Sequence, residues 1–282
     1  MGEGKKDAIV LCLEQVRRFD HDRFLTLAFV PADRQAGLAA LYAFNAEIAR
    51  IAELVSEPML GQIRLQWWRE MLEALGKGET GGHFVAEAFV KMGNRAPVPQ
   101  GAMQRLINAR ERDLDDAPFP DLRALETYAE ETSSTLIAAA LEILGGEAQI
   151  HALAVQCGGI AYALTGLLRA IGAHAAQGRV LLPADLLNRH GVDPHDMLAG
   201  RMTDALRAAA HELIGRAQEQ LALARAVPVP RHLLAAILPV ALCDKYLAVM
   251  SAPGFNFFGH ESEVPAFRRQ LRLFGRRLAG KF

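Results

Sequence analysis

Apolar and polar residues recur along most of this chain with the period of an α-helix. Between Pro31 and Met71 the apolar residues stand mainly three, four or seven positions apart, the spacing of one helical face. In the first half of this stretch they are Leu38, Leu41, Tyr42, Ile48, Ile51 and Ala52. The polar turn Ser56, Glu57 and Pro58 interrupts the pattern. The stretch therefore predicts two long helices joined by a short turn.

The second of these helices contains both tryptophans of the chain. We expect Leu60, Ile63, Trp67 and Leu72 to face inward. Adjacent residues lie about 100° apart on a helix, so of Trp67 and Trp68 we expect one in the core and the other partly exposed or lining a cavity.

The same helical period continues through the rest of the chain. It predicts helices over 6–19, 85–92, 100–114, 121–144, 157–187, 203–226, 231–250 and about 263–282. Within 121–144, four consecutive hydroxyl residues, Thr132 to Thr135, can bond back to the preceding turn, so we expect them to bend the helix or to line a polar cavity. No Pro-rich or Ser/Gly-rich linker divides the chain, which predicts one all-α domain over 1–282.

Composition and charge narrow the function classes. Hydrophobic residues make up 51% of the chain, enough for a large core, and 31 basic residues nearly balance 32 acidic ones. This balance predicts no nucleic-acid partner. Three distant cysteines and a start that resembles neither a secretory signal nor a transit peptide predict a cytoplasmic protein. No stretch of about 18 uninterrupted apolar residues occurs, so we expect no membrane-spanning helix.

Two groups of polar residues could be taken for metal sites. Asp20, His21 and Asp22 are consecutive and cannot all face one ion, so we interpret them as a solvated turn. His190, His195 and Asp196 stand among turn residues and are interpreted as a surface loop.

The first long helix resembles the squalene and phytoene synthases, all-helical enzymes that join two prenyl diphosphates head to head. Arg34, Leu41, Tyr42, Ala43 and Phe44 match the pattern of that family. The resemblance implies an isoprenoid synthase-type helical bundle around a central cavity. In the enzymes a DDxxD motif follows and holds Mg²⁺ against a diphosphate. This chain has Ala49, Arg50, Ile51, Ala52 and Glu53 there. Of the metal ligands, only Glu53 is retained.

A second match lies between Leu164 and Pro183. The enzymes have roughly LTNxLRDxxxDxxxGRxYLP here, and the matching residues are Leu164, Thr165, Leu168, Arg169, Gly178, Arg179, Leu182 and Pro183. The two aspartates are replaced by Ala170 and His174. The family fold is therefore expected, but both of its Mg²⁺ clamps are damaged, and we predict no catalytic residue, no metal site and no cofactor.

The resemblance also implies residues that could line a remaining cavity or bind an anion. These candidates are Arg34, Tyr42, Glu53, Gln66, Trp67, Asp113, Tyr128, Arg169 and Arg179. Asp113 is expected to face the interior and to pair with Arg110 or Arg112.

One branch of the family matches more closely: the mitochondrial assembly factors of respiratory complex I that contain a squalene/phytoene synthase domain. The residues that match its motif are Ala43, Phe44, Asn45, Glu47, Ala49, Val55, Ser56, Glu57, Gly61, Arg64, Gln66 and Trp67. Because no transit peptide precedes them, the chain resembles a bacterial relative of that factor. Complex I subunits or assembly intermediates are the partners that this resemblance implies.

Three functions stay open. The first is a non-catalytic protein that assembles or stabilises respiratory complex I. The second is an active head-to-head prenyltransferase, which would require Mg²⁺. The third is a metal-independent isoprenoid-binding protein, in which Arg34, Arg169 and Arg179 pair with an anionic head group.

The C-terminal segment is basic and amphipathic. From Arg268 to Phe282 there are six basic residues and no acidic one, and Phe267, Leu271, Phe274, Leu278 and Phe282 are spaced on one helical face. Two interpretations stay open: a helix that lies on an anionic membrane or an acidic partner, or an apolar face packed on the domain beneath solvated arginines. Under the first interpretation, the cytoplasmic protein is also attached to the cytoplasmic face of the inner membrane.

Overall fold

Helices and turns make up the described chain. The computed structural model describes residues 7–93, 97–259 and 264–282, and these residues contain no β-strand. The all-α prediction is therefore confirmed. Two compact units are distinguished: Met1–Asp115 with Thr135–Ile150 and Pro230–Ala236, and Asp116–Ser134 with His151–Val229 and Ile237–Phe282. They are called unit 1 and unit 2, and the single domain over 1–282 stays a prediction.

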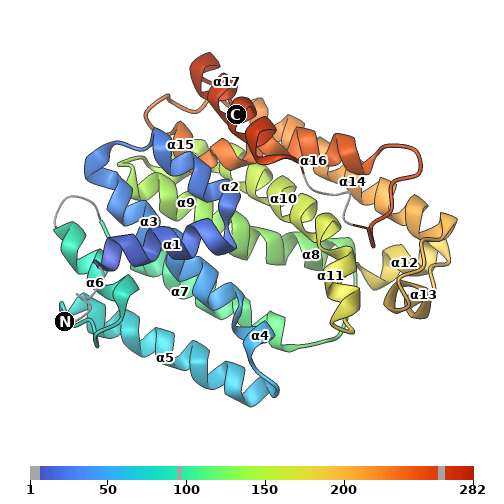
Figure 1. Cartoon of the computed structure of the whole chain (residues 1–282), viewed down its shortest axis with the longest axis horizontal. Coiled ribbons are helices and arrows are strands. Elements are labelled where there is room, and N and C mark those ends of the chain that lie inside the picture. The colour runs from blue at the N-terminus through green and yellow to red at the C-terminus, as the bar shows by residue number, and fades with distance from the viewer. Residues whose placement is uncertain (1–6, 94–96, 260–263) are drawn as a thin grey trace, which may run out of the picture. The chain divides into compact units, whose positions relative to one another are not determined.

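Unit 1 is organised around one buried helix, α3, which packs against α1, α6 and α9 (Figure 1). Nearly every residue of α3 from Gly37 to Ile48 is buried, because its small and apolar side chains face helices on several sides. The elements are α1 (Ala8–Phe19), α2 (His21–Thr26), η1 (Leu27–Phe29), α3 (Ala32–Ala49), α4 (Ile51–Leu54), α5 (Pro58–Gly76), α6 (Phe84–Met92), α7 (Gln100–Ala109), η3 (Arg110–Leu114), α9 (Thr135–Ile143) and most of η5 (Ala148–His151) and α15 (Leu234–Ile237).

Unit 2 is organised around the long pair α10 and α14, with α8, η4 and α16 packed on α10. The elements are α8 (Leu122–Ala129), η4 (Glu130–Ser134), α10 (Ala152–Arg169), α11 (Ile171–Ala176), α12 (Ala184–His190), α13 (Pro194–Leu198), α14 (Asp204–Arg225), η6 (Leu238–Leu242), α16 (Cys243–Met250) and α17 (Ala266–Ala279). Thr203 caps α14 by accepting a hydrogen bond from the backbone of Leu206.

Two glycines in α10 differ sharply in their surroundings. A Cβ atom at Gly159 would lie 2.5 Å from the backbone nitrogen of Ser134, so only glycine allows η4 to approach this closely. At Gly166, on the same helix, a Cβ atom would meet nothing within 4 Å. Close packing of α10 against η4 therefore depends on Gly159.

The hydroxyl cluster forms a π-helical segment, η4, between α8 and α9. Thr132 donates its hydroxyl hydrogen to the carbonyl of Tyr128 at 2.7 Å, and Ser134 donates to the carbonyl of Gln156 at 2.8 Å. The helix is therefore irregular at the hydroxyl run, as the first of the two expectations had it, and Thr132 bonds back to the preceding turn while Ser134 bonds across to α10.

Some expected helices are interrupted. The periodicity predicts one helix over 231–250, but this segment divides into α15, η6 and α16 because Pro239 lacks the N–H that a continuous helix needs. The helix after Pro31 likewise divides at Arg50 into α3 and α4. One stretch, Ala148–Arg169, is long and apolar enough to cross a membrane by length and composition, but more than half of it is buried, as in a core helix.

Candidate functional site

The position of the first metal clamp lies at the break between α3 and α4. Ala49 is the last residue of α3, and the guanidinium of Arg50 lies 3.6 Å from the centre of the Phe19 ring. Arg50 Nε is 3.9 Å from the carboxylate of Glu53, which is half exposed. A methyl group, a cation and one carboxylate paired with that cation therefore occupy the motif.

Tyr42 and Arg34 lie further toward the start of α3. Tyr42 is fully buried, and its hydroxyl has no hydrogen-bond partner among the described residues. Burial raises the pKa of this phenol, so it stays neutral. Arg34 is half-buried, pairs with Asp33 at 3.2 Å and donates to the carbonyl of Ile143 at 3.3 Å. Tyr42 therefore lies in the interior of unit 1, and Arg34 lies at its edge.

Asp113 belongs to a small polar network that reaches α3. Arg110 Nη1 donates to Asp113 at 3.1 Å, and its Nη2 lies 3.5 Å from the amide oxygen of Asn45. Both side chains of the ion pair are largely shielded from solvent. The predicted pairing of Asp113 with an arginine is confirmed, and the partner is Arg110. This network connects η3 to the motif residue Asn45.

Glu47, which lies two residues beyond Asn45, is a partly shielded acid of α3 itself. Gln15 of α1 donates its amide hydrogen to the Glu47 carboxylate. Burial raises the pKa of Glu47, although the hydrogen bond from Gln15 and the charge of Arg50 act in the opposite direction. The acid therefore lies where α1 and α3 pack.

The remaining unit 1 candidates lie on the outer surface of α5. Gln66 is exposed and donates to Glu70 at 3.1 Å, and Trp67 is 42% exposed and meets His83 at a centroid distance of 5.2 Å. Trp68 is buried instead, as expected of one member of the pair. Because both side chains are exposed, Gln66 and Trp67 are not placed to line a buried cavity.

The predicted inward face of α5 is wrong for three of its four residues. Leu60, Ile63 and Trp67 are exposed, and only Leu72 is buried. The helix carries two apolar stripes, and the buried one consists of Leu65, Trp68, Met71, Leu72 and Leu75. Gly61 lies on the packed side, where a side chain would collide with Leu114 of η3.

The position of the second metal clamp lies at a helix break in unit 2. Ala170 follows the last residue of α10, and α11 begins at Ile171 and carries His174. Arg169, just before the break, lies 3.8 Å above the ring of Tyr246 in a cation–π contact. The two expected aspartates are thus replaced by a methyl group and an imidazole.

Tyr128 and Arg179 are the last candidates, both in unit 2. Tyr128 is half-buried, with its ring 5.3 Å from that of Phe119. Arg179 Nε lies 3.1 Å from the carboxylate of Asp116. Tyr128, Arg169 and Arg179 therefore already have local contacts within unit 2, while the other six candidates lie in unit 1.

This donor set does not fit Mg²⁺, which prefers several oxygen ligands in octahedral geometry. Of the motif positions, Ala49, Arg50, Ala170 and His174 offer no carboxylate, and the single carboxylate left, Glu53, lies beside the cation Arg50. Across the described residues no group of three or more His, Cys, Asp or Glu side chains is arranged to hold a metal.

The two polar groups near turns are engaged locally. Asp20 caps α2 and pairs with Arg23 at 2.5 Å, His190 lies 2.7 Å from Glu212, and Asp196 pairs with Arg201. The expectation of a solvated turn is wrong for Asp22, which is only 5% exposed because α2 begins at His21 and buries it.

A cluster around Asp244 escapes prediction from the sequence. Arg225 of α14 binds Asp244 of α16 through two hydrogen bonds of 2.9 Å, and Arg272 and Arg276 of α17 also reach this carboxylate. Burial acts to raise the pKa of Asp244, but the hydrogen bonds and charges of Arg225 and Arg272 outweigh it and lower the pKa. One signal is present in the sequence: Asp244 is the only acid in the apolar stretch Leu233–Met250.

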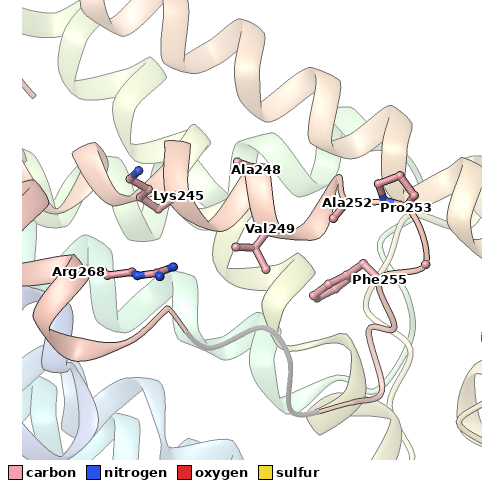
Figure 2. A pocket seen from close by; sticks show the side chains of 8 residues that line it. Lys245, Ala248, Val249, Ala252, Pro253, Phe255 and Arg268 are labelled. Carbon is pink, nitrogen blue, oxygen red and sulfur yellow. The ribbon is translucent and has the colours of Figure 1, made fainter.

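A hollow of about 550 Å³ lies along α16. One of the residues that line it, Lys245, directly follows Asp244 in the sequence. The hollow is lined by Lys245, Ala248, Val249, Ala252, Pro253, Gly254, Phe255 and Arg268. Figure 2 shows Arg268 and Phe255 extending toward each other from opposite sides, with Val249 between them. Its lining has two basic residues and no acid, and is otherwise apolar.

Comparison with known proteins identifies relatives along nearly the whole chain. The family described as squalene/phytoene synthase matches residues 16–273. The complex I assembly factor 6 of Rattus norvegicus, a factor for NADH dehydrogenase (ubiquinone), is 32% identical over 260 residues, covering 91% of this chain and 78% of that protein. A phytoene synthase of Thermus thermophilus is 34% identical over 161 residues, covering 55% of this chain and 54% of that protein.

A solved structure agrees with the fold. A dehydrosqualene synthase in complex with a ligand superimposes with a TM-score of 0.84 and 16% identity, covering 96% of this chain and 95% of that one. At this level of identity the similarity establishes the isoprenoid synthase fold and no more.

Proposed function

The chain belongs to the squalene/phytoene synthase family, and from this premise we propose that it is a non-catalytic member that helps to assemble or stabilise respiratory complex I. The observation that carries the proposal is the similarity to assembly factor 6 proteins, which extends over most of both chains. Subunits or assembly intermediates of complex I are the proposed partners. The proposed location is the cytoplasm, with attachment to the cytoplasmic face of the inner membrane.

The replaced donors support the non-catalytic part of the proposal. Ionisation of an allylic diphosphate depends on metal ions that neutralise the leaving group. Ala49 and Ala170 offer no ligand atom, and Arg50 is a cation at a position that the family uses for an anion. The local contacts of Arg50 with Phe19 and Glu53 give this residue a structural role in its place.

The exposed face of α5 is the surface we propose for contact with a protein partner. This α5 patch consists of Met59, Leu60, Ile63 and Trp67 of α5 together with Leu54 at the end of α4, and these side chains are between 42% and 68% exposed. The surrounding exposed residues carry both charges, including Glu57 and Arg64. An apolar centre with Met and Trp inside a polar rim of mixed charge is typical of protein interfaces. The patch also overlaps the motif shared with the assembly factor branch.

Deletion and complementation test the assembly role. A strain that lacks this chain should lose membrane NADH:quinone oxidoreductase activity and accumulate incomplete complex I, and the wild-type gene should restore both. Substitution of Met59 and Ile63 by serine should abolish restoration without unfolding the protein, because both side chains are exposed. The control replaces Val90 and Leu223, two exposed apolar residues outside the patch, by serine. Normal complex I activity in the deletion strain would refute the proposal.

The second candidate is an active head-to-head prenyltransferase, which the similarity to a phytoene synthase favours. Purified protein should be incubated with labelled farnesyl and geranylgeranyl diphosphate, with and without Mg²⁺. The non-catalytic proposal expects neither diphosphate release nor hydrocarbon. Turnover that disappears without Mg²⁺ would establish the enzyme instead. Retention of either diphosphate without turnover would favour the isoprenoid-binding alternative.

A further inference from the structure

The apolar face of α17 points away from unit 2. Phe267, Leu271, Phe274 and Leu278 are 63%, 69%, 52% and 62% exposed, although they form one stripe along the helix. Leu273 is the one fully buried residue of α17. This arrangement decides between the two interpretations of the segment, because the apolar stripe does not pack on the domain. Phe282 differs from the stripe, since it is buried.

Ion pairs on the opposite side hold α17 in this orientation. Arg272 and Arg276 both reach Asp244 of α16, which Arg225 of α14 binds as well. Arg225 Nε also donates to the carbonyl of Phe282 at 2.9 Å. The basic face is therefore clamped to the unit, whereas an isolated amphipathic helix would bury its apolar face. Figure 1 shows α17 in red, with its label beside the C-terminus.

The surroundings of the stripe are basic. By helical geometry Arg268 lies on one flank of the stripe and Arg277 on the other. Lys281 is exposed just beyond the helix, and the neighbouring hollow adds Lys245 (Figure 2). The sequence places Glu261 and Glu263 before the helix, outside the described residues, and has no acid from Arg268 onward. Of the six basic residues there, Arg272 and Arg276 pair with Asp244 on the opposite face and are not counted. Cations thus outnumber anions around the stripe.

Size and charge argue against a protein occupant. Four half-exposed side chains offer about 400 Å² of apolar surface, roughly half of what each partner contributes to a standard protein interface. Two copies that met through this stripe would also bring their Arg268 and Arg277 flanks together, which like-charge repulsion opposes. A bilayer with acidic lipids has an apolar interior beneath a layer of anionic head groups. It therefore matches a narrow apolar stripe that is flanked by cations.

We propose that α17 is a membrane-docking helix: Phe267, Leu271, Phe274 and Leu278 enter the boundary of an anionic bilayer, and Arg268 and Arg277 meet lipid phosphates. Asp244 is the positioning residue that keeps the stripe outward. The inference deepens the proposed function, on which it rests for its biological purpose, because it states how the chain reaches a membrane complex.

Vesicle sedimentation of the full chain tests the proposal. Wild-type protein should bind vesicles of phosphatidylcholine with phosphatidylglycerol and should bind pure phosphatidylcholine more weakly. Replacing all four stripe residues by serine should weaken binding by at least about tenfold, since each buried large apolar side chain is worth about that factor. Substituting R268Q and R277Q should reduce binding to the acidic vesicles and flatten its dependence on salt.

A matched control uses the other exposed apolar face. Serine at Leu54, Met59, Leu60 and Ile63 removes side chains of similar exposure from the α5 patch and should leave vesicle binding unchanged. Circular dichroism should show native helix content for both serine variants. The proposal would be overturned if the stripe variant bound the acidic vesicles as strongly as the wild type. It would also be overturned if the wild type bound acidic vesicles no more strongly than pure phosphatidylcholine vesicles. If the wild type were a dimer and the stripe variant a monomer, the stripe would be assigned to contact with a second copy of the chain instead.

Failure of this inference and failure of the proposed function give different results. Absence of vesicle binding together with lost complex I activity on deletion would reject only the docking helix. Normal complex I activity on deletion together with stripe-dependent vesicle binding would reject only the assembly role.

Discussion

Arg225 and Asp244 form a bidentate ion pair between α14 and α16, with Nη1–Oδ1 and Nη2–Oδ2 distances of 2.9 Å each. The pair is partly shielded from solvent and is shared with two arginines of α17. It therefore connects three helices of unit 2 through one carboxylate.

The first prediction concerns Arg225. Substituting Arg225→Met should lower the free energy of unfolding by about 1–3 kcal/mol, because it leaves a shielded carboxylate with fewer donors. Amide exchange in α17 should accelerate, since the bond to the Phe282 carbonyl is lost too. Arg189→Met is the control, because Arg189 is exposed and its pairs with Asp185 and Glu212 should contribute less than about 1 kcal/mol. Equal effects of the two substitutions would contradict the clamp.

The second prediction concerns pH. Because Arg225 and Arg272 lower the pKa of Asp244 despite its burial, the folded protein holds this carboxylate ionised more strongly than the unfolded chain does. Its stabilising contribution should be complete above the ordinary value of 3.8 and should be lost as the pH falls through the lowered value. Urea unfolding of the wild type and of D244N over an acid pH series should give a stability difference that shrinks on acidification. A difference independent of pH would refute it.

The third prediction uses the two glycines of α10. Gly159→Ala should lower the free energy of unfolding by about 3 kcal/mol, because its Cβ atom would collide with the Ser134 backbone. Gly166→Ala has open space and should raise it by roughly 0.5–1 kcal/mol through helix propensity. Thermal and urea unfolding measure both. A tolerated Gly159→Ala would mean that η4 does not pack against α10 this closely.

The fourth prediction concerns Tyr42. Its hydroxyl is buried and has no hydrogen-bond partner among the described residues. Tyr42→Phe should therefore leave the free energy of unfolding unchanged or raise it by up to about 1 kcal/mol, since it removes an unsatisfied polar group without changing the packing. A loss of more than about 1 kcal/mol in urea unfolding would indicate that the hydroxyl is bonded after all.

Much of the local structure could be predicted from the sequence because its causes are local. Pro58 starts α5, and Thr203 caps α14. The hydroxyl run 132–135 marks the π-helical η4, whose side chains compete with the backbone within one turn. The absence of carboxylates at Ala49, Arg50 and Ala170 is likewise a matter of side-chain chemistry, and it needed no structure to be recognised.

The sequence by itself determined the helices, the family and the missing metal ligands, whereas the tertiary structure decided which helical faces are covered. On α5 the stripe with Leu65 and Trp68 is buried and the one with Ile63 is not, although both have the same period. On α17 the basic face lies inward, because Asp244 offers a shielded anion that the periodicity does not reveal. The spacing of apolar residues indicates that a helix has two different faces, but only the neighbouring elements determine which face finds a partner.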